Sequence, residues 1–408
     1  MKTSFYAFFS TAYLLLSCLG LSAQKVRTVS WTTITDESHV PVYSLPDPLQ
    51  CKDGSIVTTL EQWESIRRPE LLDMLTTYMY GKTPDADHLG YETLAYEPRL
   101  FEGIAVRKII RIYLTKEGNR GPCVEAFIYT PAVQKSVPAF MLFNIPKDED
   151  ILRLLHHGYG VVCFKNTEAA ADNMEAFTSG VIPAYYRKGQ TCPYPDEWGS
   201  IAAWAWTASR VMDYLEVDND VDETKVAIHG HSRLGKTALW AGASDRRFAM
   251  VFPAGSGCCG AALSRRMFGE TLFNANVAFP HWFCGNFQQF SMRENLMPFD
   301  QHEVIALCAP RPVYIAAGED DSWADPKGEY LSGRAANPVY SLYGEVGLAA
   351  AQWPEVDKPS QEGLIAYHVR KGGHTVNEYD WEKFIEFADK YLKSGKDIIG
   401  KQYKRRSL

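Results

Sequence analysis

One segment past the middle of the chain places a serine, a lysine and two glycines at spacings that two kinds of chemistry use; it reads Gly-His-Ser-Arg-Leu-Gly-Lys-Thr. From Gly230 to Thr237 it matches the phosphate-binding pattern G-x-x-x-x-G-K-(S/T), in which backbone amides and the lysine bind phosphates. Around Ser232 it resembles a nucleophile elbow, the tight turn that exposes a serine hydroxyl between a strand and a helix. The usual elbow, G-x-S-x-G, requires a glycine where this chain has Leu234, and Gly235 comes one residue later.

The elbow predicts an acid and then a histidine later in the chain, the order found in α/β-hydrolases. A strand predicted at residues 313–317 is followed by Asp320 and Asp321, and a strand predicted at residues 365–370 is followed by two glycines and His374. The glycines allow a tight turn at the end of the strand, which is the edge where parallel sheets bind ligands. We therefore expect the serine, the histidine and one of these aspartates to form a triad.

These three residue types together perform acyl transfer. A serine hydroxyl is a poor nucleophile until an imidazole takes its proton, and the imidazole needs a carboxylate to fix its tautomer and orientation. The negative oxygen of the tetrahedral intermediate then needs hydrogen-bond donors, each worth about 100- to 1000-fold in rate. The backbone N–H of Arg233 follows the nucleophile and is the natural donor, and its guanidinium is a candidate for the second.

The pattern of apolar residues predicts the elements that position these groups. The first two strands are expected to pair antiparallel across a turn at residues 117–122, and later strands alternate with helices, which is typical of βαβ units and a mostly parallel sheet covered on both faces. We therefore predict an α/β-hydrolase fold in which residues 24–408 form a single catalytic domain. The predicted strands are residues 106–114, 124–129, 137–145, 160–164, 225–229, 249–252, 313–317 and 365–370, and the predicted helices are residues 200–216, 237–243 and 379–393.

The N-terminus has the order of a secretory signal peptide: Lys2, an apolar run, and small residues before Gln24. We predict a signal peptide at residues 1–23 and a secreted or periplasmic protein, with lipoprotein processing at Cys18 as the less favoured alternative. A phosphate-binding loop normally serves cytoplasmic nucleotides, so export favours the elbow.

The composition narrows the class of partner. Hydrophobic residues make up 46% and charged residues 22% of the chain, as in an ordinary globular protein. A net charge of -7 argues against nucleic acid as a partner, because phosphate binding needs a basic surface. No later segment is long and apolar enough to span a membrane. The chain has neither a CxxC pair nor an HExxH helix, so we expect no metal ion and no cofactor.

Further motifs between Trp198 and the last predicted helix form a family signature. In these motifs the chain resembles the glucuronoyl esterases of carbohydrate esterase family 15, bacterial type. The elbow of that family has a lysine four residues after the serine, the position that Lys236 occupies here. That resemblance accounts for the displaced glycine and removes the phosphate-loop interpretation. The motifs are Trp198-Gly199, Ala202-Ala203-Trp204-Ala205-Trp206, the elbow, Ala238-Leu239-Trp240-Ala241-Gly242, Leu263-Ser264-Arg265-Arg266, Gly269-Glu270, Phe279-Pro280-His281-Trp282-Phe283, Asp300-Gln301-His302, Ala309-Pro310-Arg311-Pro312, Trp323-Ala324-Asp325-Pro326 and Gly373-His374.

The resemblance implies hydrolysis of an ester at the carboxyl of a glucuronate or 4-O-methylglucuronate side chain of xylan, with release of a lignin-type alcohol. It implies an esterified glucuronoxylan or lignin-carbohydrate substrate as the partner, and we expect a monomer. Carried over by position, the matching residues are Ser232 as nucleophile, His374 as base, Arg233 as the oxyanion-stabilising arginine, and Lys236, Glu270 and Trp323 as residues that hold the sugar.

One departure from the family concerns the acid. In many members a glutamate follows the strand after the elbow, but here Gly255 stands at that position, so the acid must come from the later loop. The family pattern of an aspartate two residues before the Trp-Ala-Asp-Pro tryptophan selects Asp321 over Asp320. Asp325, next to Pro326, is expected to organise the loop instead.

Two other functions share part of this signature. An acetyl xylan esterase of the same fold would have the triad but would not need the lysine and the glutamate that bind the uronate. A non-catalytic glycan-binding protein would keep the pocket and lack a working triad.

Overall fold

The computed structural model describes residues 33–85, 89–116 and 121–394, which belong to a unit that begins at Thr33. The signal peptide predicted at residues 1–23 lies outside the described residues, as does most of the turn predicted at residues 117–122. No helix within the described ranges is long and apolar enough to cross a membrane.

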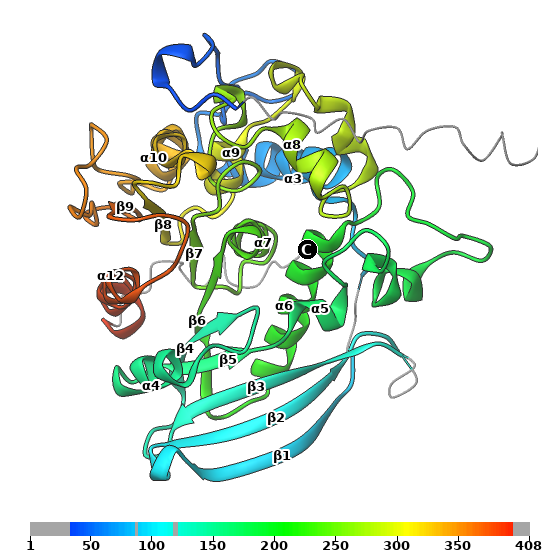
Figure 1. Ribbon diagram of the computed structural model, residues 1–408, viewed down its shortest axis with the longest axis vertical. Coiled ribbons are helices and arrows are strands. Elements are labelled where there is room, and N and C mark those ends of the chain that lie inside the picture. The colour runs from blue at the N-terminus through cyan, green and yellow to red at the C-terminus, as the bar shows by residue number, and fades with distance from the viewer. Residues whose placement is uncertain (1–32, 86–88, 117–120, 395–408) are drawn as a thin grey trace, which may run out of the picture. The chain divides into compact units, whose positions relative to one another are not determined.

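A mixed sheet of nine strands forms the centre of the described part of the chain (Figure 1). Its order is β1-β2-β3-β5-β4-β6-β7-β8-β9; the first four strands in this order pair antiparallel, and from β5 onward every pair is parallel. The mostly parallel α/β prediction is confirmed. The strands are β1 (Tyr91–Leu100), β2 (Ala105–Tyr113), β3 (Cys123–Pro131), β4 (Val137–Leu142), β5 (Gly160–Cys163), β6 (Val221–His231), β7 (Met250–Ala254), β8 (Val313–Gly318) and β9 (Ile365–Arg370).

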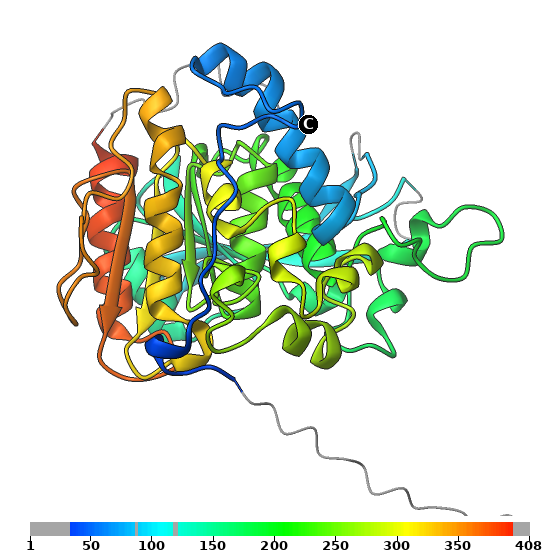
Figure 2. The ribbon, with the colours of Figure 1, turned by 90° about the horizontal axis from the view of Figure 1, so that it is seen from above.

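Helices cover both faces of the sheet. On one face α4 and α12 pack on the strands, and on the other face α6, α7 and α10 do so, with α9 against α7 and α10. Figure 2 shows β9 between the red α12 and the gold α10. The α-helices are α2 (Leu60–Gln62), α3 (Arg68–Leu75), α4 (Asp148–His156), α5 (Asn166–Ala169), α6 (Ser200–Leu215), α7 (Arg233–Ser244), α8 (Leu272–Ala278), α9 (Gln301–Ala306), α10 (Pro326–Ala335), α11 (Asn337–Leu342) and α12 (Glu378–Ala388).

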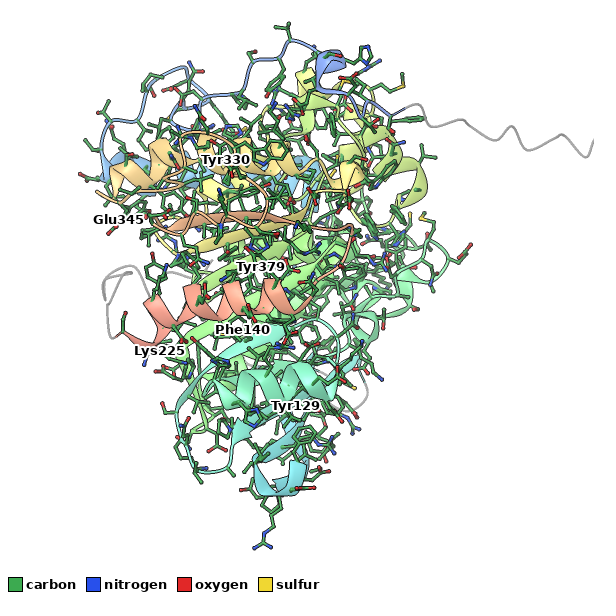
Figure 3. All side chains as sticks on the ribbon, turned by 60° about the vertical axis from the view of Figure 1, so that its left-hand side comes forward. Tyr129, Phe140, Lys225, Tyr330, Glu345 and Tyr379 are labelled. Carbon is green, nitrogen blue, oxygen red and sulfur yellow. The ribbon has the colours of Figure 1, made fainter. Side chains whose placement is uncertain are left out.

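Apolar side chains from the central strands fix these layers. Phe140 of β4 is fully buried and its ring contacts those of Tyr159, Phe252 and Trp381, so it joins the sheet to α12 (Figure 3). Such aromatic contacts contribute about 0.5 to 1.5 kcal/mol each beyond the area that they bury. On the opposite face α6 is buried nearly all round, because the sheet and neighbouring helices enclose it.

Candidate active site

The loop between β6 and α7 is a strained turn. β6 ends at His231, α7 begins at Arg233, and Ser232 between them has φ 59° and ψ −129°. A positive φ is costly for any residue with a side chain, and such strain is found mainly at functional sites. The Ser232 N–H donates to the Ala254 carbonyl at the end of β7 (2.9 Å). The serine therefore lies at the N-terminus of α7, on the carboxyl edge of the parallel strands.

The unusual spacing of the glycines has a steric reason. A Cβ added to Gly230 would lie 2.0 Å from the carbonyl oxygen of Leu234, and one added to Gly235 would lie 2.9 Å from that of Ala254. The first turn of α7 therefore packs directly on the backbone of β6 and on the end of β7. Gly235, rather than position 234, is the residue that faces β7, which explains why the glycine is displaced.

The structure places Asp321 against His374. The Nδ1 atom of His374 lies 2.5 Å from Oδ2 of Asp321, and the Asp321 side chain is buried. Asp320 is exposed and takes no part in this contact. Asp325 instead accepts a hydrogen bond from Arg266 Nε (2.8 Å) and caps α10, so it organises the loop.

The two loops that carry Asp321 and His374 are paired along their backbones. Glu319 N–H donates to the Arg370 carbonyl (2.8 Å), and Asp320 N–H donates to that of Gly372 (3.2 Å). A Cβ on Gly318 would lie 2.4 Å from the Gly372 carbonyl oxygen. The chain can bring the acid and the base together only because a glycine ends β8.

Arg370 is a supporting residue that the sequence reasoning missed. Its guanidinium donates to the carbonyls of Lys371 (2.9 Å), Gly373 (3.2 Å) and Thr375, and its Nε donates to Asp380 at the start of α12 (2.8 Å). It thus holds the loop that contains His374 at several points. The sequence contained a signal, an arginine at the end of a buried strand, but the acid that fixes it lies on the next helix.

The predicted nucleophile and the predicted base both lie beside the loop after β7. Gly255 directly follows Ala254, whose carbonyl accepts the hydrogen bond from the Ser232 N–H. A Cβ at Gly255 would lie 3.6 Å from Cε1 of His374. Within the described residues no hydrogen bond joins the Ser232 hydroxyl to His374, and catalytic hydrogen bonds without substrate are often loose. The ring of His231 lies 4.4 Å from that of His374. Burial, followed by the nearby His374, lowers the pKa of His231 to about 4, so His231 is neutral at pH 7.

The predicted sugar-binding residues form a second group. The buried Lys236 ammonium donates to the carbonyls of Ser256 (2.7 Å) and Cys258 (2.5 Å) and to Glu270 Oε2 (3.3 Å). Burial alone would lower the pKa of Lys236, but the Glu270 carboxylate together with the neighbouring Cys258 and Cys259 outweighs it and the pKa is raised, so the lysine stays charged. Glu270 N–H donates to the Trp323 carbonyl (2.9 Å), and Trp323 is 44% exposed.

Arg233 is the last of the predicted site residues. It is the first residue of α7, its side chain is 46% exposed, and its Nε lies 2.7 Å from Oδ2 of Asp172. The structure therefore brings Asp321 to His374, brings both to the loop beside Ser232, and joins Lys236, Glu270 and Trp323 to one another.

A cavity of about 890 Å³ lies among α3, α6, α7 and the start of β1, but it does not contain this chemistry. The predicted triad residues Ser232, Asp321 and His374 do not line it. Charged groups on its wall pair with one another, as Arg247 does with Asp213 and Glu216. In the part of the chain that the structure describes, no group of His, Cys, Asp and Glu side chains is arranged to hold a metal ion.

The chain is similar to known esterases over most of its length. A family model described as "Glucuronyl esterase, fungi" matches residues 114–344. The carbohydrate esterase MZ0003, from an unknown prokaryotic organism, is 42% identical over 401 residues, which cover 88% of this chain and 92% of that protein. The structure of a glucuronoyl esterase from Solibacter usitatus has a TM-score of 0.82 and 38% identity, over 87% of this chain and 99% of that one. A promiscuous CE15 esterase from a marine bacterial metagenome has a TM-score of 0.80 and 41% identity, over 88% and 100%.

Proposed function

The chain belongs to carbohydrate esterase family 15, the glucuronoyl esterases, and from that premise we propose that it cleaves the ester between (4-O-methyl-)glucuronic acid side chains of glucuronoxylan and lignin-type alcohols. As a family member it is a carboxylic ester hydrolase. The observation that carries the finer proposal is the buried Lys236–Glu270 pair beside the exposed Trp323. A uronate ring offers hydroxyls that can donate to a carboxylate and accept from an ammonium or an indole N–H.

The proposed mechanism uses this chain's residues in two steps. The Ser232 hydroxyl attacks the carboxyl carbon of the glucuronate while His374 takes its proton, and His374 then protonates the departing alcohol. Water, deprotonated by His374, next attacks the acyl carbon, the bond to Ser232 breaks, and His374 returns the proton to the Ser232 oxygen as the glucuronic acid leaves. Asp321 holds the imidazole, and the Arg233 backbone N–H and guanidinium stabilise the negative oxygen in both steps.

The first prediction concerns the substrate. Purified protein should release alcohol from benzyl glucuronate much faster than it releases acetate from acetylated xylan or 4-nitrophenyl acetate. The comparison is informative because one relative is described as promiscuous. Faster acetate release at matched concentrations would contradict the proposal and favour an acetyl xylan esterase, and the absence of all turnover would favour a glycan-binding protein.

The second prediction separates the sugar-binding group from the triad. Lys236→Ala should lower kcat/KM for benzyl glucuronate about 10- to 100-fold, the scale of one lost charge-assisted hydrogen bond of about 1.5 to 3 kcal/mol. Cleavage of 4-nitrophenyl acetate should change little, because that substrate has no sugar.

The matched control is Lys225→Ala, which removes a lysine that pairs with Asp222 on β6. Thermal unfolding should be measured for both variants, because Lys236 also ties down the loop at Ser256 and Cys258. Equal losses on the two substrates would show that the lysine serves the elbow or the general electrostatics, and not the sugar.

We also propose that the protein acts as an exported monomer. The signal peptide expected at residues 1–23 and a polymeric substrate of the plant cell wall support export. All residues of the proposed site belong to one chain, so no second copy is needed to complete it.

A further inference from the structure

Asp172 is the ion-pair partner of Arg233, and neither the sequence signature nor the mechanism above includes it. It lies in the segment between α5 and α6, far from the elbow in sequence, and its carboxylate is only partly exposed. Its Oδ2 contacts Nε of Arg233 at 2.7 Å. The guanidinium that is expected to stabilise the oxyanion is therefore held by an acid from a separate loop.

Two further side chains hold the carboxylate of Asp172 in place. Its Oδ1 accepts a hydrogen bond from Trp282 Nε1 (2.8 Å) and lies 3.0 Å from Nε2 of the buried His281. Burial alone would raise the pKa of Asp172, but the bonds from His281 and Trp282 and the charge of Arg233 outweigh it and hold the pKa below its usual value. Asp172 therefore carries its charge at neutral pH.

The segment that holds Asp172 is anchored on the N-terminus of α6. Ser200 N–H donates to the His281 carbonyl (2.8 Å) and Ile201 N–H to that of Trp282 (3.2 Å). A Cβ at Gly199 would lie 2.6 Å from the Trp282 carbonyl oxygen, so this approach requires a glycine. The anchor is thus part of the packed fold.

We propose that Asp172 is a positioning residue that aims the Arg233 guanidinium at the reacting ester. The geometry allows it because the contact uses Nε. An arginine has five N–H donors in a fixed planar fork, and among the described residues no hydrogen bond engages the four on the two terminal nitrogens of Arg233, so they remain for the oxyanion. An arginine side chain loses rotamer entropy when it is fixed, and here the folded protein has already ordered it before the substrate arrives.

The proposal rests on the proposed role of Arg233, and a double-mutant cycle tests the two separately. Four full-length proteins are compared on benzyl glucuronate: wild type, Asp172→Asn, Arg233→Gln and the double variant. Asp172→Asn should lower kcat about 10-fold, part of the 100- to 1000-fold expected for losing an oxyanion donor, while KM changes less than about twofold because the charge develops only in the transition state. The double variant should be no slower than Arg233→Gln alone.

Two further variants test whether Asp172→Asn lowers kcat only by disturbing the fold. Asp172→Glu, which keeps the carboxylate, should recover part of the lost kcat. Asp222→Asn, which breaks an ion pair of similar exposure with Lys225, should leave kcat unchanged. If Arg233→Gln keeps wild-type kcat, the oxyanion role of Arg233 is wrong. The positioning role of Asp172 is wrong if Asp172→Asn is as fast as wild type. It is also wrong if Arg233→Gln is slow and the loss of kcat in the double variant equals the product of the losses in the two single variants.

Discussion

Ser232→Ala should lower kcat on benzyl glucuronate by about a million-fold, the scale seen when a triad nucleophile is removed. The change deletes the one oxygen that can form the acyl-enzyme. It leaves the strained backbone at φ 59° occupied by another residue with a Cβ, so the elbow should keep its shape. Binding of glucuronate should be unaffected, because no predicted sugar-binding residue is changed.

The measurement must be made against the uncatalysed rate, because an oxyanion site alone can leave 1000- to 10,000-fold of residual catalysis, in rough terms. A suitable control is Ser244→Ala at the other end of α7, whose hydroxyl donates to the Trp240 carbonyl (2.7 Å). Thermal unfolding of the two variants should be similar. Turnover by Ser232→Ala close to that of wild type would show that another residue is the nucleophile.

The sequence predicted the parallel half of the sheet better than its antiparallel edge. Each predicted strand is present, and β9 has the predicted bounds. Strands buried on both faces are continuous apolar runs, which a sequence reveals directly. β1 was not predicted, because most of its residues are exposed and it contains Pro98. α4 was missed too, although it has the apolar spacing of a helix that covers a sheet.

In the candidate site, too, the residues that the sequence predicts are those marked by their immediate neighbours in the chain. Ser232 and His374 could be proposed from the sequence because a strand and glycines mark each of them. Asp172 and Asp380 could not, because their roles depend on which loops and helices pack side by side. The acid of the predicted triad was an intermediate case. The residues alone did not decide between Asp320 and Asp321, and the family pattern selected Asp321. In the structure the pairing of the loops after β8 and β9 places Asp321 beside the imidazole of His374.

Asp321→Asn should lower kcat by about 10,000-fold while the protein stays folded, because an amide in place of a triad aspartate holds the histidine in the wrong tautomer. The matched control is Asp320→Asn, the same change at the exposed neighbour. It should remain within a few fold of wild type. The assignment is wrong if Asp321→Asn stays within a few fold of wild type and Asp320→Asn is the inactive variant.

Adding Gly255→Glu to Asp321→Asn tests whether the acid can be supplied from the loop after β7. A Cβ at this position would lie 3.6 Å from His374 Cε1, the ring atom bonded to Nδ1, so a carboxylate would be within reach. The same Cβ would lie 3.2 Å from Nε2 of His231, and φ at this position is 48°. A side chain in this left-handed region costs roughly 1 to 2 kcal/mol.

We therefore expect a partial recovery of kcat together with a lower thermal unfolding temperature than that of Asp321→Asn. If a folded double variant is no faster than Asp321→Asn, Gly255 is not a position from which this imidazole can be held.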